Sequence, residues 1–408
     1  MAISKEELVP NVKRAIEEII SSEKIISPPM IEISPGCEVG DGFASKTLAV
    51  DIKGLDKTIN LFVKYFPEDD QNPLIKVFAM VFNTEFRFYD KIFPEMIKFQ
   101  QEKGLTEQEM FQNVPKHLKT LIEYNGIPPI ILENLRPIGY KLRNFKSSID
   151  EDHLTLSLKA YAQYHAISFA MKDQRSELFK KLSVDIKDFH VAAFNVMRLA
   201  DSLGGMIDSF LSNLDPVLDR KLLNECRNLK EVLIHNVANL NKLVDDYAVI
   251  CQGDCWSNNM MYLYDETTGK PIDVKLVDWQ IQRYNSPVLD VSYFFYSVAT
   301  IETLKNFDKY FNFYYNTLAE FLKRLGSDPR KLYPKVVYLN HWKKFSKFGL
   351  TMCFVAFMVE YAKKDNLPDF IDGKGQEMPE FAVELDEKDM YQKRLKLLVE
   401  HFVERDFL

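Results

Sequence analysis

The residues best able to do chemistry in this chain lie between positions 251 and 279. Asp254 and Asn259 stand five positions apart in a polar loop, and Asp278 follows two apolar segments separated by a turn at Gly269. If those segments pair as an antiparallel hairpin centred on the turn, Asn259 and Asp278 lie across from one another. An amide oxygen beside a carboxylate suits Mg²⁺, and Asp254 would face the same space as a base. One base with two metal ligands indicates phosphoryl transfer.

A purely structural interpretation stays open from the loop alone. Aspartate and asparagine are common in turns, where their side chains bond to nearby backbone groups, and this spacing occurs often by chance. The second acidic residue, at the mirror position on an apolar strand, favours a functional site over a plain loop. The elements that would position these side chains therefore decide between the two interpretations.

Strands are predicted first. Residues 31–66 hold β-branched and aromatic segments separated by glycine-bearing turns, which is typical of a small β-meander. On the last of these strands Lys64 shares a face with Phe62 and Phe66. The lysine therefore either extends past the edge of the sheet to water or enters a cleft to meet an anion.

An apolar helix predicted over residues 74–93 supplies that anion. Glu85 falls on the same stripe as Val81 and Phe88, where a carboxylate without a partner is costly. Lys64 on the preceding strand is the candidate partner. The alternative is a helix rotated so that Glu85 reaches the edge of the stripe.

Glycines cluster where the first two strands connect, at Gly36, Gly40 and Gly42. A hairpin of this kind can present backbone N–H groups to phosphates, although the sequence contains neither a dinucleotide-binding motif nor a P-loop. A plain hairpin without a ligand is the alternative interpretation.

The division of the chain follows from where strands give way to helices. A further strand is expected around residues 118–124, and a buried strand at 130–133 leads to a linker marked by Pro137. We place the boundary here. Residues 1–135 are expected to form an N-terminal lobe, and residues 136–408 a helical C-terminal lobe.

Helices dominate beyond this boundary. The helix expected over residues 152–172 carries His165 on its apolar stripe, where a buried, hydrogen-bonded histidine is favoured over a catalytic one. A helix beginning near Pro287 places Asp290 among apolar neighbours, so this carboxylate needs buried partners such as backbone amides of the loop described above. Long amphipathic helices follow, interrupted by a polar loop at 364–380. Strands first and helices later predict an α+β fold in two lobes.

The composition excludes some classes of protein. The 52 basic and 59 acidic residues give a formal net charge of −7 without a basic tail, which argues against nucleic acid as the main partner. No run of about 18 uncharged apolar residues predicts a membrane span, and the charged N-terminus lacks the apolar core of a signal peptide. Five scattered cysteines, an odd number, fit a reducing compartment. We therefore expect a cytoplasmic protein without a membrane or nucleic-acid partner.

Several spaced motifs, in this order, resemble the ecdysteroid kinase-like (CHK kinase-like) family, relatives of choline kinase and the aminoglycoside phosphotransferases. The resemblance rests on QGDCWSNN, VKLVDWQ and SPVLDVSYF, with FVKYFP, ILENLRPIGY and YAQYHAISFAMK in support. It covers most of the chain. It implies a protein-kinase-like fold. Residues 1–135 would form a small β-rich N-terminal lobe that binds nucleotide, and residues 136–408 a large helical C-terminal lobe with the catalytic loop and the substrate pocket.

The resemblance also implies roles for the residues singled out above. Asp254 would be the catalytic base that deprotonates an acceptor hydroxyl, and Asn259 and Asp278 would bind Mg²⁺. Lys64, positioned by Glu85, would hold the phosphates of ATP.

Further roles follow for the nucleotide site. The turn from Gly40 through Gly42 to Ser45 would cover the phosphates. The backbone of Glu133 and Leu135 would contact adenine.

Two residues would support the catalytic loop. Asp290 would brace it from the following helix. The family's loop histidine is Gln252 here, and glutamine supplies a donor and an acceptor in a different shape. The base and the metal ligands are kept, so we expect an active kinase.

The resemblance implies an ATP- and Mg²⁺-dependent kinase that phosphorylates a hydroxyl of an ecdysteroid or of a similar steroid or xenobiotic alcohol. One alternative is a catalytically weak, pseudokinase-type binding protein, for which Gln252 is the only sequence support. Another is a choline- or aminoglycoside-type kinase, which would need an acidic acceptor pocket.

Overall fold

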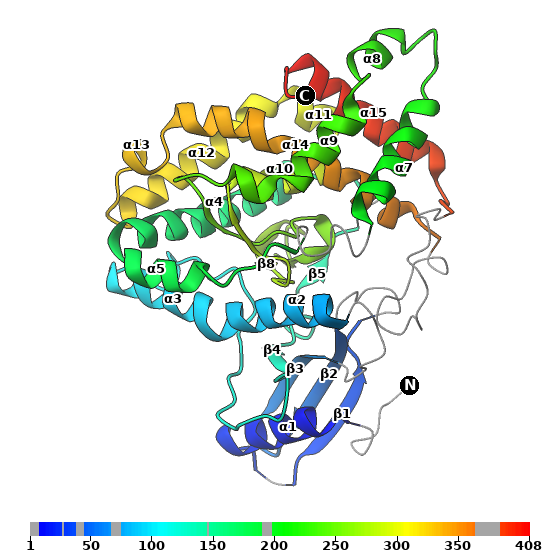
Figure 1. Cartoon of the computed structure of the whole chain (residues 1–408). Helices are drawn as coiled ribbons and strands as arrows, with labels where there is room; N and C mark the ends of the chain where they lie inside the picture. The colour runs from blue at the N-terminus through cyan, green and yellow to red at the C-terminus, as the bar shows by residue number, and fades with distance from the viewer. Residues whose placement is uncertain are drawn as a thin grey trace.

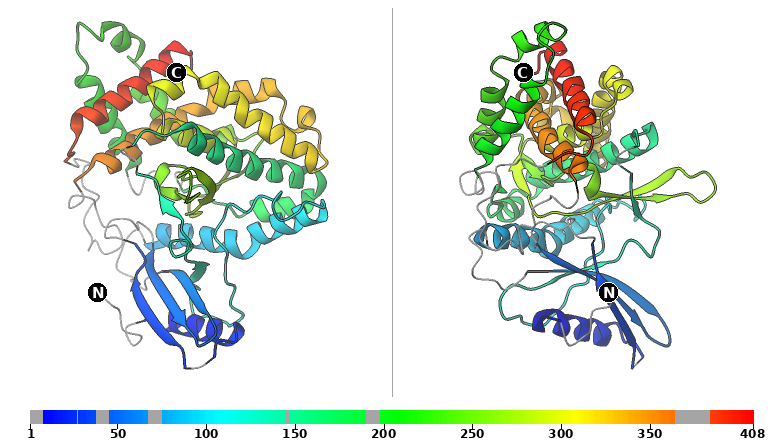
Figure 2. Two further views of the ribbon diagram at one scale, coloured as in Figure 1. Left: turned by 180° about the vertical axis from the view of Figure 1, so that it is seen from behind. Right: turned by 90° about the vertical axis from the view of Figure 1, so that its right-hand side faces the viewer.

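The computed structural model describes residues 8–26, 28–37, 45–66, 75–144, 147–189, 198–363 and 384–408. An antiparallel sheet with one helix against it forms one end of the molecule, and a larger group of helices forms the other (Figures 1 and 2). The strands of this sheet precede nearly all of those helices in the chain. An N-terminal antiparallel sheet followed by a largely helical part is the order of a protein-kinase-like fold, and it confirms the predicted α+β class.

The N-terminal sheet has four antiparallel strands in the order β1-β2-β3-β4. Their bounds are β1 Met30–Pro35, β2 Lys46–Lys53, β3 Thr58–Tyr65 and β4 Ile130–Glu133. The predicted meander and the predicted buried strand are therefore confirmed.

One face of this sheet packs against helix α1 (Pro10–Ser22) and forms a separate apolar core with it. Val50 and Val63 of the sheet and Ile16 of the helix are fully buried there. Lys64, next in sequence to Val63, points to the opposite face because side chains alternate along a strand.

The prediction of a strand around residues 118–124 is wrong. The segment forms an isolated bridge to β4 at His117. Beyond it, the amides of Leu121 and Ile122 donate to the carboxylate of Glu18 on α1. Because these N–H groups bond to a side chain, they cannot serve a strand ladder.

The helix after β3 is longer than predicted and changes its winding. It continues through α2 (Ile75–Arg87), the π-helical segment η2 (Phe88–Ile92) and α3 (Phe93–Glu102). The amide of Phe93 donates to the carbonyl of Phe88, five residues earlier, just before Pro94. Because proline has no N–H to donate, the local π geometry lets the helix continue past it.

Two small sheets lie in the second part of the chain. One contains β5 (Lys141–Leu142), β7 (Met260–Tyr264) and β8 (Pro271–Leu276), in that order. The other pairs β6 (Val249–Cys251) with β9 (Arg283–Asn285). The predicted β7–β8 hairpin is therefore present.

The register of this hairpin differs from the expected one by one position. Met260 pairs with Leu276, and Val277 donates its amide to the carbonyl of Asn259 at 3.0 Å. Asn259 therefore lies opposite Val277, and the expectation that it lies opposite Asp278 is wrong. Asp278 follows the ladder and adopts a positive φ of 63°, a conformation that ends the strand.

The predicted helices of the second part are present. The described helical segments are α4 Glu151–Gln174, α5 Ser176–Ser183, α7 Leu199–Ser212, α8 Arg220–Glu225, α9 Leu229–Ala238, η3 Leu240–Leu243, η4 Ser257–Asn259, α10 Val288–Ser297, α11 Ile301–Lys305, α12 Phe307–Arg324, α13 Pro329–Leu332, α14 Lys335–Tyr361 and α15 Lys388–Glu404. The backbones of α10 and α14 approach closely at Gly349, where an added Cβ would lie 2.6 Å from the carbonyl carbon of Ser292. Glycine therefore permits the packing of these two helices.

Two expectations are not decided here. The polar loop predicted at 364–380 lies outside the described residues. The division into lobes at residue 135 stays a prediction.

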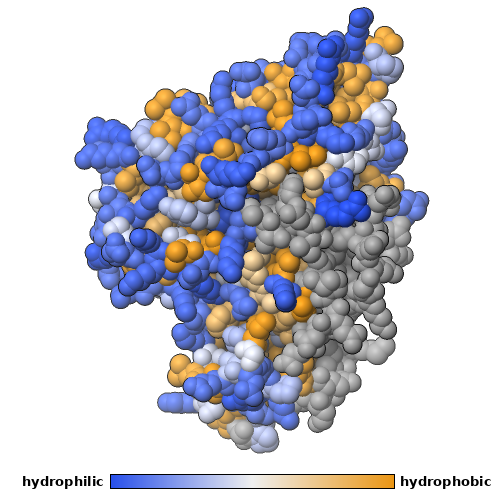
Figure 3. All heavy atoms as spheres, in the orientation of Figure 1, coloured by the Kyte–Doolittle hydropathy of each residue, from blue (hydrophilic) through white to orange (hydrophobic). Residues whose placement is uncertain are grey.

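Within the described ranges, no helix is both long enough and apolar enough to cross a membrane. On the face shown in Figure 3, hydrophilic and hydrophobic side chains are interspersed, and hydrophobic ones gather around α2 and the sheet beside it.

Candidate active site

The ammonium group of Lys64 joins two carboxylates that are far apart in the sequence. Its Nζ lies 2.9 Å from both carboxylate oxygens of Glu85 on α2 and 3.3 Å from Oδ1 of Asp278. The side chain of Glu85 is 1% exposed and that of Lys64 is 11% exposed. Burial alone would lower the pKa of Lys64, but Asp278 and Glu85 raise it above its ordinary value. The structure thus places the lysine against the predicted anion and not in water.

Trp279 links Glu85 to Asp278, and the sequence analysis missed it. Its backbone N–H donates to Oε1 of Glu85 at 3.2 Å, and its indole N–H donates to the carbonyl of Leu276 at 3.0 Å. The indole lies stacked on the ring of Phe88, one turn after Glu85. The sequence does hold a signal for this contact. One large aromatic residue directly follows Asp278, and another lies one helical turn after Glu85.

Asp254 and Asn259 are held together inside the loop. Nδ2 of Asn259 donates to Oδ2 of Asp254 at 2.8 Å and to its carbonyl at 3.0 Å. The short 3₁₀ turn η4, which ends at Asn259, brings the two side chains together. Because these bonds use the amide nitrogen of Asn259, its amide oxygen is left to coordinate a cation.

The electrostatics of the two aspartates suit a divalent cation. Burial, and then the charge of Asp278, raise the pKa of Asp254 from 3.8 to about 7. The carboxylate of Asp278 thus lies close enough to oppose the ionisation of Asp254, and a cation between the two side chains would relieve this repulsion. Carboxylate and amide oxygens are hard ligands of the kind that Mg²⁺ takes, so the residues present fit this ion.

Asp290 holds the start of the loop from the first turn of α10. Its Oδ2 accepts the backbone N–H of Gln252 at 2.6 Å, and its Oδ1 accepts that of Gly253 at 3.0 Å. Gly253 has a φ of +93°, and a Cβ there would lie 2.0 Å from the carbonyl oxygen of Ile281, so the turn requires glycine. The predicted contact between Asp290 and the loop amides is present.

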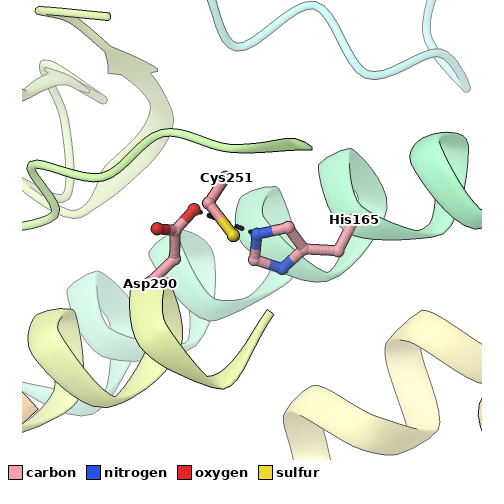
Figure 4. Close-up of side chains that lie close together, drawn as sticks. All are labelled: His165, Cys251 and Asp290. Carbon is pink, nitrogen blue, oxygen red and sulfur yellow. Dashed lines mark hydrogen bonds and ion pairs between the residues drawn. The ribbon is translucent and has the colours of Figure 1, made fainter. Parts of the chain in front are cut away.

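His165 lies beside Asp290 and Cys251, and the three side chains point toward one another (Figure 4). All three are buried, with possible ligand atoms within 4.8 Å of one another. Nε2 of His165 lies 3.1 Å from Oδ2 of Asp290, and its Nδ1 lies 2.7 Å from the hydroxyl of Tyr314. Both ring nitrogens and both oxygens of Asp290 thus have protein partners, which fits a bracing cluster better than a metal centre. The expected buried, hydrogen-bonded histidine is confirmed.

Gln252 uses both ends of its amide group. Its Oε1 accepts the hydroxyl of Tyr161 at 2.5 Å, and its Nε2 donates to the carbonyl of Val277 at 2.7 Å. The side chain is fully buried. It therefore ties the loop to α4 and to the residue preceding Asp278, which weakens the only sequence support for a pseudokinase.

The turn that was expected to cover the phosphates is described only at its end, from Ser45 on. Gly40 and Gly42 lie outside the described residues. Ser45 directly precedes β2. Its role in binding phosphate stays a prediction.

The groups expected to contact adenine lie at and after the end of β4. The amide of Glu133 donates to the carbonyl of Lys116 at 2.9 Å, so Glu133 keeps only its carbonyl for a nucleotide unless this bond breaks. The carbonyl of Leu135 accepts the amide of Tyr140 at 3.1 Å. Of the backbone groups predicted to contact adenine, the carbonyl of Glu133 and the amide of Leu135 therefore remain as candidates.

Known proteins similar to this chain include small-molecule kinases. A segment of 79 residues is 29% identical to a 4-hydroxytryptamine kinase of Psilocybe cyanescens, and it makes up 19% of this chain and 17% of that protein. The chain thus matches less than a fifth of the length of this relative.

Two solved structures are similar over nearly the whole chain at low identity. An ethanolamine kinase of Plasmodium vivax is similar over 98% of this chain and 91% of its own, with a TM-score of 0.44 and 12% identity. A spectinomycin phosphotransferase in complex with ADP and spectinomycin is similar over 97% and 98%, with a TM-score of 0.45 and 12% identity. The family model for the ecdysteroid kinase-like family matches residues 39–327, well over half of the chain, and the chain belongs to this family.

Proposed function

We propose that this protein is a kinase that transfers the γ-phosphoryl group of ATP to a hydroxyl group of a small molecule. The observation that carries the proposal is the pair of contacts made by Lys64, which is bonded at once to Glu85 and to Asp278. A strand, a helix and the end of a hairpin each supply one member of this network. Asp254 and Asn259 form the adjoining pair.

The residues divide the reaction between them. Asp254 accepts the proton of the acceptor hydroxyl as the bond forms between the acceptor oxygen and the γ-phosphorus. The bond from that phosphorus to the bridging oxygen breaks, and the electron pair leaves with ADP. Lys64 neutralises phosphate charge, and Glu85 keeps its ammonium group in place.

Asn259 and Asp278 would hold Mg²⁺ through the amide oxygen and the carboxylate. When bound, this ion would neutralise the charge that develops on the β- and γ-phosphates. The raised pKa of Asp254 fits a base that works near neutral pH.

For the acceptor we propose an ecdysteroid or a similar steroid or xenobiotic alcohol. The family description supports this class. A cationic acceptor such as choline calls for an unpaired carboxylate. Glu360, which contacts the loop at Ser257, is already paired with Arg394.

The test combines an acceptor screen with one substitution. The protein is incubated with ATP, Mg²⁺ and, separately, an ecdysteroid, choline and an aminoglycoside, and mass spectrometry records any phosphorylated product. We expect product from the neutral alcohol and a loss of about 10²–10⁴-fold in Asp254→Asn with ATP binding retained. Wild-type turnover in Asp254→Asn would show that another residue is the base. Product from choline alone would overturn the acceptor class.

A further inference from the structure

The far end of the catalytic loop contacts a carboxylate that the proposed chemistry does not use. The hydroxyl of Ser257, in the turn η4 that ends at Asn259, lies 3.4 Å from Oε1 of Glu360. Glu360 is the second-last residue of α14, and its side chain is 1% exposed. A buried carboxylate needs charged or hydrogen-bonding partners to stay ionised.

Arg394 of α15 supplies the countercharge. Its Nη1 lies 2.5 Å from Oε2 of Glu360, and its Nη2 donates to the carbonyl of Ser297 at 2.6 Å. Its guanidinium carbon lies 3.6 Å from the centre of the Phe357 ring. The arginine is therefore fixed from three sides, and it fixes Glu360 in turn.

The catalytic loop is thus held by a buried carboxylate near each end. Asp290 of α10 accepts the amides of Gln252 and Gly253 at its start, and Glu360 of α14 contacts Ser257 near its end. The two carrier helices are in backbone contact. They therefore set the distance between the two points at which the loop is anchored.

We propose that Glu360, held by Arg394, is a positioning residue that fixes Ser257 and thereby the amide oxygen of Asn259. The importance of Asn259 rests on the proposed function. Glu360 and Arg394 both lie beyond residues 39–327, which the family model matches. Through Arg394 alone, the C-terminal helix α15 would thus contribute to the shape of the proposed metal site.

Stability alone does not require this ion pair. Replacing a buried ion pair by apolar residues of similar size often leaves stability unchanged or improves it. The Glu360–Arg394 pair also accepts a hydrogen bond from Ser257, close to the proposed metal ligand Asn259, which an apolar pair could not do.

The experiment is a double-mutant cycle in the whole chain with Ser257→Ala, Glu360→Met and both together; methionine is similar in length to glutamate but has no oxygen to accept the serine hydroxyl. Mn²⁺ serves as the metal probe, and its affinity is measured in the presence of ADP. Loss of the hydrogen bond should weaken Mn²⁺ binding about 3- to 10-fold in each single variant. The double variant should bind no more weakly than Glu360→Met, because both substitutions break the same hydrogen bond.

A second readout needs no ligand. The amide of Asn259 donates to the carbonyl of Trp256, and that of Val277 donates to the carbonyl of Asn259. Hydrogen exchange at these two amides should accelerate in Ser257→Ala without a comparable change in α10. Because this serine variant leaves the Glu360–Arg394 pair intact, it is expected to fold even if Glu360→Met is unstable.

Lys396→Met is the matched control. Lys396 also lies on α15 and forms an ion pair with Asp219 at 2.5 Å, away from the loop. This variant should keep the Mn²⁺ affinity and the loop exchange rates of the wild type.

The outcomes separate this inference from the proposed function. Unchanged Mn²⁺ affinity and loop exchange in Ser257→Ala would overturn the role of Glu360. So would a double variant whose loss of Mn²⁺ affinity equals the product of the losses in the two single variants. A wild-type protein that binds Mn²⁺ with ADP but phosphorylates no acceptor would overturn the proposed kinase function. In that case the expected result of the double-mutant cycle would still support the positioning role of Glu360. A wild-type protein that binds no Mn²⁺ with ADP overturns both.

Discussion

The indole of Trp279 lies flat on the ring of Phe88, with 3.9 Å between the ring centroids and 9° between the ring planes. Trp279 follows Asp278 directly, and Phe88 follows Glu85 by one helical turn. The stack therefore ties the end of the β7–β8 hairpin to the helix that carries the partner of Lys64. Both rings are fully buried.

Trp279→Ala should lower both stability and nucleotide affinity. Removing a buried tryptophan leaves a cavity and costs about 3–5 kcal/mol. It should also weaken binding of ADP with Mn²⁺, because Glu85 loses its fixed relation to Asp278. Trp279→Phe keeps an aromatic ring against Phe88 but loses the indole bond to Leu276 and some buried packing, so it should retain most of the affinity. Urea unfolding and calorimetric titration measure the two effects.

Trp342→Ala is the control for this experiment. Trp342 is 2% exposed and packs against Phe307 and Phe311 in the helical part. Its loss should destabilise the protein by a similar amount but leave the affinity of the folded protein for ADP with Mn²⁺ unchanged. Equal loss of affinity in both variants would refute a specific role for the Trp279–Phe88 stack.

Lys64→Met should separate stability from activity when combined with a second change. Alone, it leaves the carboxylates of Glu85 and Asp278 without their shared cation and should cost about 3–5 kcal/mol of stability. Adding Glu85→Leu removes the unpaired buried charge and should recover most of that loss. Phosphorylation of an acceptor should stay abolished in both variants, because the phosphates of ATP lose their ammonium partner.

Urea unfolding and product analysis by mass spectrometry provide the two readouts. Activity in the double variant would show that Lys64 is dispensable for the reaction. A double variant less stable than Lys64→Met would show that the hydrogen bond from the Trp279 amide to Glu85 stabilises the fold by more than the unpaired carboxylate costs.

Much of the fold was predictable because hydrophobic periodicity is a local property. The four strands, the long helices and the α+β order follow from the alternation and spacing of apolar residues. The Lys64–Glu85 pair was also predictable, because a carboxylate on an apolar stripe needs a cation. These predictions use only neighbours in sequence and the cost of burial.

The remaining features depend on tertiary contacts. The hairpin register was wrong by one position because Asp278 leaves the strand with a positive φ, which alternation does not reveal. Glu360, like Glu85, is a carboxylate within an apolar run of the sequence. The sequence pattern does not predict that its helix ends beside Ser257. The prediction of a strand at 118–124 failed because two backbone N–H groups of this segment donate to the carboxylate of Glu18, over a hundred residues earlier in the chain.

Gln252→His, which restores the family's residue, should leave activity within about threefold of the wild type. Glutamine already accepts from Tyr161 and donates to Val277, and neutral histidine offers one donor and one acceptor for the same partners. Gln252→Leu leaves both partners without a bond and should cost about 1–3 kcal/mol of stability. Steady-state kinetics and urea unfolding test the pair of variants. A rise in turnover of tenfold or more in Gln252→His would show that glutamine impairs catalysis.

His401 should make the protein acid-sensitive. It is 6% exposed among the rings of Tyr296, Phe307 and Phe407, and burial lowers its pKa from 6.5 to about 4. Above the unfolded pKa of 6.5 both states hold a neutral ring, so stability is complete. As the pH falls from 6.5 toward 4, the unfolded chain binds a proton that the folded protein excludes, and stability is lost.

The loss of stability assigned to this one group is no more than about 3.5 kcal/mol, since each unit of pKa difference contributes about 1.4 kcal/mol. His401→Leu should flatten the fall in the free energy of unfolding between the two pKa values. Urea unfolding above, within and below that interval measures the slope. Phe402→Leu, a buried apolar change in the same cluster, should lower stability at every pH and leave the slope as in the wild type. An unchanged slope in His401→Leu would mean that the ring is protonated equally in both states, which burial of an imidazolium among these aromatic rings opposes.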